Sequence, residues 1–568
     1  MSPAHTIADV SEEIDGDDAL THNVSAGAAL ADVVRTTLGP AGNDKMVVGD
    51  GEVLVTNDGS HIVDQLDVEA PAARIVADLA RAQGGALGDG ATSAIVLAGA
   101  LLREAEPLIE DGLHPTTVVN GYAAASRRAR DRAAELADPG DADDGDALRD
   151  VVATAVTGRW DAERTAFLAD LIVRGYRSTL VDGGDGATRS ERLTIQHAPG
   201  GATTDSELID GLVVDTDRSS TSLSDVPTEL PDRLSDPRIA IVDDEIALER
   251  DGSAARVSVE TADQRRRLRE FESAEYDRLL ATLRELDVDV LLSQKSIDDR
   301  FRSLLARAGI VSVERTRQDE IHKIERATGA APVMRIEDLT PETVGRADLL
   351  ERRSLGGSTF VIVRDAASTQ TSLLLRGSPE HVVEETERIV ADGLRLLEGF
   401  GERPALLPGG GATEAAIAHD LRRWSPTIRT REQLAVDRFA DALETIPATL
   451  ARNAGADALE TTLELRRRHD AGDRTAGFDA TAGAVTDVLS AGIVEPLPLK
   501  TRIVSNATQA ACSILRIDGI IRIAGSIGEA GPHDADDHGH GHGHNHGHGH
   551  ATGGPERSTH GYPWAIGH

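Results

Sequence analysis

Hydrophobic residues recur at helical spacing near both ends of the chain, whereas the middle alternates between short apolar runs and polar stretches. The first apolar region extends to about Leu136 and includes residues 93–109, whose apolar residues form a stripe along one helical face. A loop of Pro, Gly, Ala and Asp follows, and further helical segments are expected between Leu148 and Tyr176. Because apolar positions at this spacing give a helix one buried face, the pattern predicts a mainly helical N-terminal region.

The middle of the chain has a mixed pattern. From Arg192 onward come short β-like runs such as LTIQH, GLVVD and RIAIVDDE, then a long charged helix at about 262–286. An apolar strand (VDVLLS) and an amphipathic helix (IDDRFRSLLARAG) follow. Another helix is expected over 381–397, before a second apolar region at 412–523. Since mixed segments lie between two mainly helical ends, with no repeat of fixed period, the pattern indicates domains inserted within domains.

Length and composition exclude several classes of protein. A chain of 568 residues and 60.0 kDa is long enough for three or four domains. The longest apolar stretch, near residues 94–102, is far shorter than the roughly 20 residues that a membrane helix needs. No basic segment followed by an apolar one begins the chain, so we expect a cytoplasmic protein without a membrane partner. The single cysteine, Cys512, cannot form an internal disulfide, which agrees with a reducing compartment.

The charge is strongly acidic. Ninety-six acidic residues against 59 basic ones give a formal charge of −37, and only four of the basic residues are lysines. Such a surface repels nucleic acid, so we expect no nucleic-acid partner. It also repels itself, except in molar salt, where the screening length falls to about 3 Å. We interpret the acidity as adaptation to a salty cytoplasm; a GC-rich genome explains the scarcity of lysine but not the acidic excess.

We interpret the segment Gly84–Thr92 (GGALGDGAT) as a glycine-rich hinge that holds one carboxylate, Asp89, directly before an apolar helix. The first N–H groups of a helix have no intrahelical partners and attract anions together with the helix dipole. A carboxylate there can hold Mg²⁺ against nucleotide phosphates. The alternative is a glycine-rich turn with a good helix N-cap and no ligand.

Several motifs together resemble the group II chaperonins, the archaeal thermosome family. Three of them, in matching order and spacing, are similar to the nucleotide motifs of that family: LGPAGNDKM (38–46), VTNDG (55–59) and GDGAT (88–92). Related strings follow as QKSIDD, LARAGI, DLTPETVGRADLLERR, the glycines at 409–411, NAGAD (453–457) and VEPLPLKTR (494–502). The likeness covers residues 20 to 525, and the agreement of so many motifs in one order is very improbable by chance.

The resemblance implies a multidomain α+β chaperonin fold and an ATP-driven ring subunit that folds proteins. It implies a mainly helical equatorial domain, an α/β intermediate domain and an α/β apical domain with a helical lid protrusion. The expected boundaries are 1–147 and 401–528 for the equatorial domain, 148–211 and 361–400 for the intermediate domain, 212–360 for the apical domain and 529–568 for a disordered tail. ATP and Mg²⁺ are the implied cofactors. Unfolded polypeptides and like or related subunits in a double ring are the implied partners.

Carried over residue by residue, the resemblance implies a phosphate loop, a metal ligand and a nucleoside pocket. Asp89 would hold Mg²⁺. The other implied nucleotide-binding residues are Thr37, Leu38, Gly39, Pro40, Asn57, Gly88, Gly90, Ala91, Thr92, Ser93, Arg159, Gly410, Gly411, Asp479 and Glu495. Among them, Gly410 and Gly411 would pass beneath the nucleoside, Glu495 would accept hydrogen bonds from the ribose, and Asp479 would help to close the pocket.

The implied catalytic carboxylates are Asp392 and Asp58, which would orient and partly deprotonate the attacking water. On its helix, Asp392 shares a face with Glu385, Arg388 and Arg395, opposite an apolar face. Periodicity alone predicts that this face is exposed to solvent. For Asp58, in the Asn57-Asp58-Gly59 turn, the alternative role is turn chemistry.

Three positions depart from the family pattern. Ala91 replaces the usual threonine, Ala41 replaces a common lysine, and Arg159 stands where a lysine that senses the γ-phosphate is expected. Arginine keeps the charge but has a different geometry. These departures leave the rate of hydrolysis open.

The lid and the tail carry further expectations. Residues 255–280 correspond to the lid protrusion, and their RRRLRE cluster would either meet acidic residues of a neighbouring subunit or form a solvated helix face. Aromatic residues make up only 2% of the chain, so client recognition should use aliphatic and polar contacts. The tail alternates glycine or asparagine with histidines that could capture transition metals weakly, or it is a hydrophilic filler: His538, His540, His542, His544, His546, His548 and His550.

Three functions therefore remain to be compared. The first is an ATP-driven folding chaperone, the second a catalytically weakened structural or regulatory subunit of a mixed ring. The third is a metal-binding assembly that acts through the histidine tail.

Overall fold

The computed structural model describes residues 10–49, 52–180, 192–215, 232–247, 262–364 and 369–523. It divides into two compact units, residues 1–19 with 518–568 and residues 20–517. In the smaller unit, β1 (Val10–Asp15) pairs antiparallel with β20 (Gly519–Ile523). The two ends of the described chain therefore meet in one strand pair.

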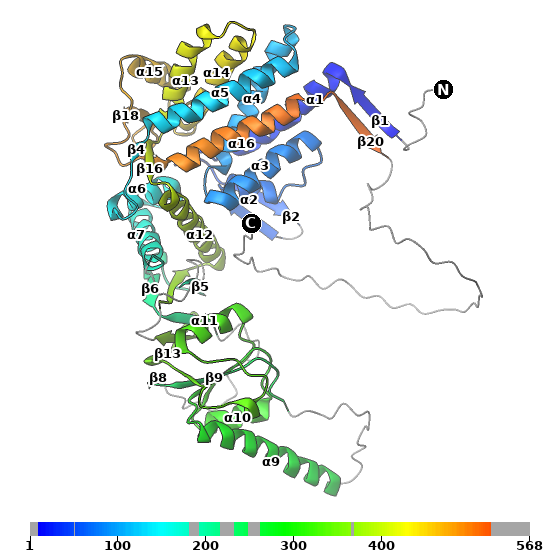
Figure 1. Cartoon of the computed structure of the whole chain (residues 1–568), viewed down its shortest axis with the longest axis vertical. Helices are drawn as coiled ribbons and strands as arrows, with labels where there is room; N and C mark the ends of the chain where they lie inside the picture. The colour runs from blue at the N-terminus through cyan, green and yellow to red at the C-terminus, as the bar shows by residue number, and fades with distance from the viewer. Residues whose placement is uncertain are drawn as a thin grey trace, which may run out of the picture. The chain divides into compact units, whose positions relative to one another are not determined.

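Helices from both ends of the chain form one apolar core in the larger unit (Figure 1). One of them is the largely buried α4 (Ala91–Glu110), which packs against α3, α14 and α16. Gly99 in α4 lies so close to Ala31 that a Cβ would come within 2.3 Å of the Ala31 side chain. The other helices are α1 (Gly16–Arg35), α2 (Gly59–Asp64), α3 (Pro71–Leu87), α5 (Pro115–Leu136), α13 (Ala412–Trp424), α14 (Glu432–Asn453), α15 (Ala458–Asp470) and α16 (Leu497–Leu515).

Short strands connect these helices. The hairpin β2–β3 (Lys45–Gly49 and Glu52–Thr56) leads to α2, and β17–β18 (Ala476–Asp479 and Ala484–Asp487) forms a second hairpin. In a three-stranded sheet, β16 (Ala405–Pro408) lies between β19 (Val494–Pro496) and β4 (Asp138–Pro139). This sheet places the segments before α13 and α16 side by side.

A second group of elements surrounds α12 (Glu380–Glu402). This helix packs against α6 (Gly145–Val156), α7 (Ala162–Ser178) and α3. Beside it lies a sheet in which β15 (Thr371–Gly377) pairs with β5 (Leu193–Pro199) in parallel and with β6 (Glu207–Asp210) antiparallel. The sheet and the helices therefore bring residues from 145–210 and 371–402 together.

The middle of the chain folds as two four-stranded sheets with their own apolar clusters. One has the order β11-β10-β9-β12 and the other β7-β14-β13-β8. Their strands are β7 (Leu212–Asp215), β8 (Arg233–Ser235), β9 (Arg238–Val242), β10 (Val290–Ser293), β11 (Val311–Val313), β12 (Gly345–Arg346), β13 (Leu349–Leu355) and β14 (Ser358–Arg364). In the described part of this region the accompanying α-helices are α9 (Ala262–Glu285), α10 (Asp299–Arg307) and α11 (Gln318–Thr328).

The fold is thus a mixed α+β, multidomain one, and most of the elements expected from the hydrophobic pattern are confirmed. The charged helix at about 262–286 is α9, the VDVLLS strand contains β10, and the 381–397 helix is the core of α12. In α9, Arg266 and Arg267 are exposed, and Arg266 lies 3.6 Å from Asp263. The expected start of the lid, residues 255–261, and the histidine tail lie outside the described residues. Within the described ranges, no helix is long and apolar enough to cross a membrane.

Candidate functional site

The turn that carries Asp89 is shorter than the glycine-rich hinge that the sequence suggested. Residues Gly84 to Leu87 belong to the last turn of α3, so that interpretation of 84–92 is wrong for its first four residues. Gly88 (φ +70°) caps α3, and Gly90 (φ +80°) is the N-cap of α4. Asp89 Oδ1 accepts the N–H of Gly90 at 2.6 Å. The N-cap of the alternative interpretation is therefore present as Gly90, without a side-chain hydrogen bond, and whether the turn also holds a ligand stays a prediction.

The segment Thr37–Pro40 forms a tight loop that another part of the chain holds in place. The Thr37 hydroxyl donates to the Val34 carbonyl at 2.8 Å. The Asn453 side-chain amide donates to the carbonyl oxygens of Arg35 and Leu38, at 3.1 and 2.9 Å. Gly39 has a positive φ of 81°. The backbone of this loop is therefore fixed by α14, whose last residue is Asn453.

Asp58 combines turn chemistry with ion pairing. Its Oδ1 accepts from the N–H of His61 at 2.9 Å and from the Ser60 hydroxyl at 2.5 Å, so it caps α2. Its Oδ2 lies 3.4 Å from Arg388 Nη1 and 3.8 Å from Arg159 Nη2. The turn interpretation of Asp58 is therefore correct for one oxygen only.

The turn of Asp58 is joined to the start of α4. Gly59 N–H donates to the Thr92 hydroxyl at 3.1 Å, and a Cβ on Gly59 would lie 2.5 Å from that oxygen. Ala91 is buried at the same place, with 4% of its surface exposed, and Ser93 is partly buried. The two motifs therefore pack directly against each other.

Asp392 lies on the face of α12 that periodicity alone would assign to solvent. That interpretation is wrong, because the side chains of Glu385, Arg388, Asp392 and Arg395 are only 17–27% exposed. Arg388 Nη1 donates to Asp392 Oδ2 at 3.0 Å, and Arg395 donates to Oδ1. The opposite face is buried in the core, as expected, through Val383, Ile389, Val390 and Leu397.

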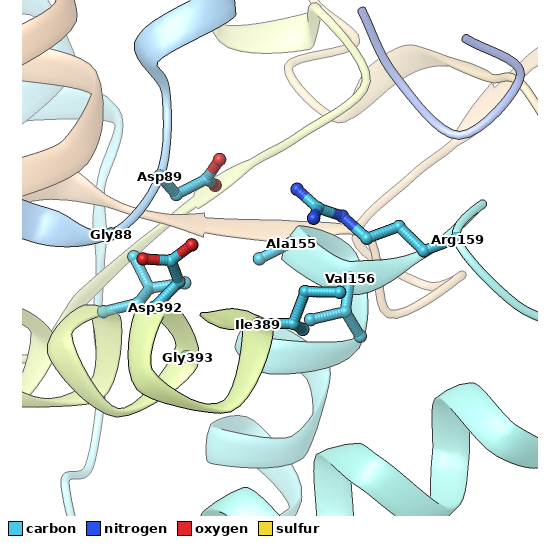
Figure 2. A pocket seen from close by; sticks show the side chains of 9 residues that line it. Gly88, Asp89, Ala155, Val156, Arg159, Ile389, Asp392 and Gly393 are labelled. Atoms are coloured by element: carbon cyan, nitrogen blue, oxygen red, sulfur yellow. The ribbon is translucent and has the colours of Figure 1, made fainter. Parts of the chain in front are cut away.

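Asp89, Arg159 and Asp392 surround one small pocket although they come from three distant segments (Figure 2). Asp89 reaches it from the α3–α4 turn, Arg159 from the α6–α7 connection and Asp392 from α12. In Figure 2 their charged groups face the same space. Arg159 Nη1 also donates to Glu385 at 3.1 Å. The other lining residues are Gly88, Ala155, Val156, Ile389, Gly393 and Leu396.

The carboxyl groups of this cluster differ in protonation behaviour. Burial raises the pKa of Asp89, and burial raises that of Asp392 to about 6, although Arg388 and Arg395 act in the opposite direction. For Asp58, burial also favours the neutral acid, but Arg388, Arg159 and its hydrogen bonds prevail and lower the pKa. Asp58 is therefore the strongest acid of the three, while Asp392 is able to take up a proton close to neutral pH.

The residues expected near the nucleoside lie in the β16–α13 connection, at the end of β17 and in β19. A Cβ on Gly410 would lie 2.6 Å from the Phe478 carbonyl oxygen, and one on Gly411 would lie 2.5 Å from Pro447. Both glycines are thus needed for close packing within the chain. Asp479 Oδ1 accepts the N–H groups of Thr481 and Ala482, at 2.8 and 3.0 Å, and so shapes the β17–β18 turn.

Glu495 belongs to a buried triad with Lys500 and Glu414. Lys500 Nζ donates to Glu414 Oε1 at 2.5 Å and lies 2.7 Å from Glu495 Oε2. Lys500 and Glu414 are each 5% exposed, and Glu495 is 19% exposed. Burial raises the pKa of Glu495 to about 7. Burial raises the pKa of Asp89, and the charge of Lys500 acts weakly against that shift, so the triad is electrostatically linked to the Asp89 turn.

The sequence reasoning missed several residues that organise this region. Lys500 and Glu414 were not singled out, although a lysine in an apolar run of a chain with four lysines is a detectable signal. Asn453 was noticed only as part of a string. Arg388 was named only as a neighbour of Asp392 on its helix, and no local pattern shows that it reaches Asp58.

Comparisons with known proteins agree with this architecture. Residues 30–524 match the TCP-1/cpn60 chaperonin family. The chain is 39% identical to the thermosome subunit alpha of Halobacterium salinarum over 539 residues, which cover 94% of each protein. It is 36% identical to thermosome subunit 1 of Haloferax volcanii over 539 residues, again 94% of each, and 37% identical to the thermosome subunit of Methanopyrus kandleri over 509 residues, 89% of this chain and 92% of that protein.

The chain belongs to the TCP-1/cpn60 chaperonin family, and within it to the group II chaperonins, or thermosomes. Its function is therefore ATP-dependent protein folding, and its enzymatic activity is ATP hydrolysis coupled to that folding. The resemblance stated from the motifs is confirmed, and the halophilic relatives agree with the interpretation of the acidic composition.

Proposed function

We propose that ATP is hydrolysed at the cluster of Asp58, Asp89, Arg159 and Asp392. The observation that carries this proposal is that two carboxylates and one guanidinium group, from three distant segments, line one pocket. Asp89 and Asp392 line the pocket. Asp58 does not line it but forms an ion pair with the lining residue Arg159. Bringing so many like charges together costs free energy unless a ligand or a reaction requires them, so the cluster marks a functional site.

The residues present suit a magnesium–nucleotide complex. Asp89 supplies a carboxylate of the kind that Mg²⁺ prefers, beside the N-terminus of a 20-residue helix that attracts phosphate oxygens. Gly39 and Gly90 have positive φ, a conformation that glycine adopts without strain and that lets the backbone turn closely around a phosphate. When bound, Mg²⁺ would neutralise charge that develops on the phosphates. In this proposal Asp89 holds the metal, and Thr37 to Pro40, Asn57, Gly88 and Gly90 to Ser93 surround the phosphates.

Asp392 and Asp58 act on the water. Asp392 accepts a hydrogen bond from the attacking water and orients it, because its carboxylate is partly buried and its pKa of about 6 lets it accept a proton. Asp58 stays ionised and supports the same water or the cations around it. Arg159 keeps a positive charge at the place of the usual lysine, 3.1 Å from Glu385. The replacement therefore preserves the charge of the site, which favours an active subunit over a purely structural one.

The nucleoside would occupy the region between the β16–α13 connection and β19. Gly410, Gly411 and Asp479 shape its walls, and Glu495 accepts hydrogen bonds from the ribose hydroxyls. Lys500 keeps Glu495 in place by its ion pair at 2.7 Å. A carboxylate held in this way is preorganised for two adjacent hydroxyl groups.

We further propose the domain arrangement and partners of the thermosome for this chain. The helical core from both ends of the larger unit supports an equatorial domain of 1–147 and 401–528, and the elements around α12 support an intermediate domain of 148–211 and 361–400. The two middle sheets support an apical domain of 212–360, with α9 in the lid protrusion. The partners are unfolded polypeptides and further subunits in a double ring in the cytoplasm. The histidine tail lies outside the described residues, so metal capture by it stays a prediction.

The test uses the full-length protein in molar KCl. The Asp89→Asn variant keeps the size of the side chain but loses the charge, so Mg²⁺-dependent ATP turnover is expected to fall about 100-fold or more. Refolding of a denatured client should fall with it. Asp64→Asn, at an exposed ion pair with Arg81, is the matched control and should keep both activities. Turnover in the wild type no higher than in Asp89→Asn would contradict the proposal and favour a structural subunit.

A further inference from the structure

Arg388 contacts carboxylates that come from both sides of the site. Its Nε and Nη2 donate to the two oxygens of Glu385, at 3.0 and 2.6 Å. Its Nη1 donates to Asp392 Oδ2 at 3.0 Å and lies 3.4 Å from Asp58 Oδ2. One guanidinium group therefore contacts three carboxylates, of which Asp58 lies at the start of α2 and the other two on α12.

The ion pairs of the described residues assign this bridging role to Arg388. Asp58 pairs with Arg159 and Arg388, and Asp392 pairs with Arg388 and Arg395. Arg388 is thus common to both sets. Its side chain is 21% exposed, so its charge is screened much less than that of a surface residue, even in molar salt.

The chemistry of the guanidinium group explains why arginine is needed here. The Asp392 and Asp58 carboxylates repel each other, and this repulsion would turn the Asp392 side chain away from Asp58. Arginine presents several N–H groups in a rigid plane and can bind separate carboxylates at the same time, whereas lysine has one small ammonium group. Arg388 therefore offsets the repulsion and fixes the direction of both carboxylates.

We propose that Arg388 is a positioning residue for ATP hydrolysis, which holds Asp392 and Asp58 together so that they face the same water. The inference rests on the proposed function of Asp392. Arg388 acts through the carboxylates and does not contact the nucleotide. It also links α12 to the segment of Asp58. The Asp392 carboxylate is therefore held in the orientation for catalysis only while α12 lies over the Asp89 turn.

The experiment measures steady-state ATP turnover of the full-length protein in molar KCl with four variants. Arg388→Gln is expected to lower kcat about 100-fold, the cost of misplacing a catalytic group, and to change KM for Mg-ATP less than about threefold. Arg388→Lys should recover only part of kcat. Because Arg388 works through Asp392, adding Arg388→Gln to Asp392→Asn should lower kcat less than about threefold further.

The control is Arg422→Gln, which removes an arginine from a partly buried cluster with Glu444 and Asp441. It should lower the melting temperature and leave kcat per folded ring unchanged. If Arg388→Gln does not assemble, Arg388→Lys decides the question, and a wild-type kcat in that variant overturns the proposal. The proposal is also overturned if the reductions of kcat in Arg388→Gln and in Asp392→Asn multiply fully in the double variant.

The failure of this inference differs from the failure of the proposed function. Wild-type turnover in Asp392→Asn alone would remove the role of Asp392 and the inference with it. An inactive Asp392→Asn together with wild-type turnover in Arg388→Gln would overturn the role of Arg388 only.

Discussion

The backbone of Asp392 lies directly against Gly88: a Cβ on Gly88 would come 2.3 Å from the Asp392 carbonyl oxygen and 2.7 Å from its Cα. Gly88 also has a φ of +70°, a backbone conformation that residues other than glycine adopt only at a cost in free energy. The turn that carries Asp89 and the helix that carries Asp392 are therefore fitted to each other at a single glycine. A similar contact joins Gly158 to Pro40, where a Cβ would lie 2.1 Å from the Pro40 carbonyl oxygen.

Gly88→Ala should move the carboxylates of Asp89 and Asp392 apart without removing either of them. The added methyl group has no space in the present arrangement, so α12 must move away from the Asp89 turn. We expect kcat for ATP to fall at least about 10-fold, since small misplacements of catalytic groups are costly, while nucleotide binding weakens less. Turnover and equilibrium binding of a fluorescent ATP analogue measure the two effects.

Gly85→Ala is the matched control for that variant. Gly85 lies within α3, and nothing is within 4 Å of a Cβ built on it. Alanine should keep wild-type turnover there and stabilise the helix by up to about 1 kcal/mol. Equal kcat in the two variants would contradict the importance of the Gly88 contact.

The pH dependence of hydrolysis should show the ionisation of Asp392. Burial raises its pKa to about 6; Asp58 acts in the same direction, and Arg388 and Arg395 act against it. The carboxylate is ionised above this pH and becomes protonated as the pH falls through it, so it can no longer accept a proton from water. We expect kcat/KM for Mg-ATP to fall below about pH 6, because this ratio reports the free enzyme.

Glu495 is a second buried carboxyl group whose pKa lies close to neutrality, at about 7. The Glu495→Gln variant separates the two groups. It should raise KM for ATP and keep the fall of kcat/KM below about pH 6. If this fall disappears in Glu495→Gln, it is due to Glu495, and the role given to Asp392 is contradicted.

Lys500→Met should destabilise the protein strongly, since it leaves Glu414 and Glu495 buried without their cation. Breaking a buried pair by removing one partner costs about 3–5 kcal/mol. Without the ammonium group, Glu495 gains a proton more easily in the folded state, so the loss should be larger at pH 8 than at pH 5. Urea unfolding in molar KCl at the two pH values measures it.

The control for this prediction is Lys295→Met. Lys295 pairs with Asp244 at the surface, with 57% of its side chain exposed, and should show no measurable loss. A loss in Lys500→Met no greater than in Lys295→Met would contradict the energetic role of the triad.

Much of this fold could be predicted from the hydrophobic pattern and the motifs. The stripe at 93–109 became α4, and the 381–397 pattern became α12, because long amphipathic helices depend mainly on local spacing. The boundaries were less certain. Gly84 and Gly85 looked like a hinge, yet they lie inside α3, since packing of the helix outweighs the modest cost of glycine.

The partners of individual side chains could not be predicted in the same way. A polar helix face has the same spacing whether it meets water or a second domain, so periodicity made Arg388 and Asp392 look solvated. The burial of Lys500 depends on Glu414 and Glu495, which lie on other elements. Such long-range pairing is a property of the tertiary structure, and only the family motifs pointed toward it.

The central claim is that a carboxylate on α12 orients water for a nucleotide held at the Asp89 turn. ATP turnover of the wild type and of Asp392→Ala in molar KCl, with Mg-ATP binding measured on the same preparations, tests it most directly. The account predicts that the variant binds Mg-ATP within a few-fold of the wild type and loses about 100-fold or more of its turnover. Equal turnover in the two proteins would contradict it.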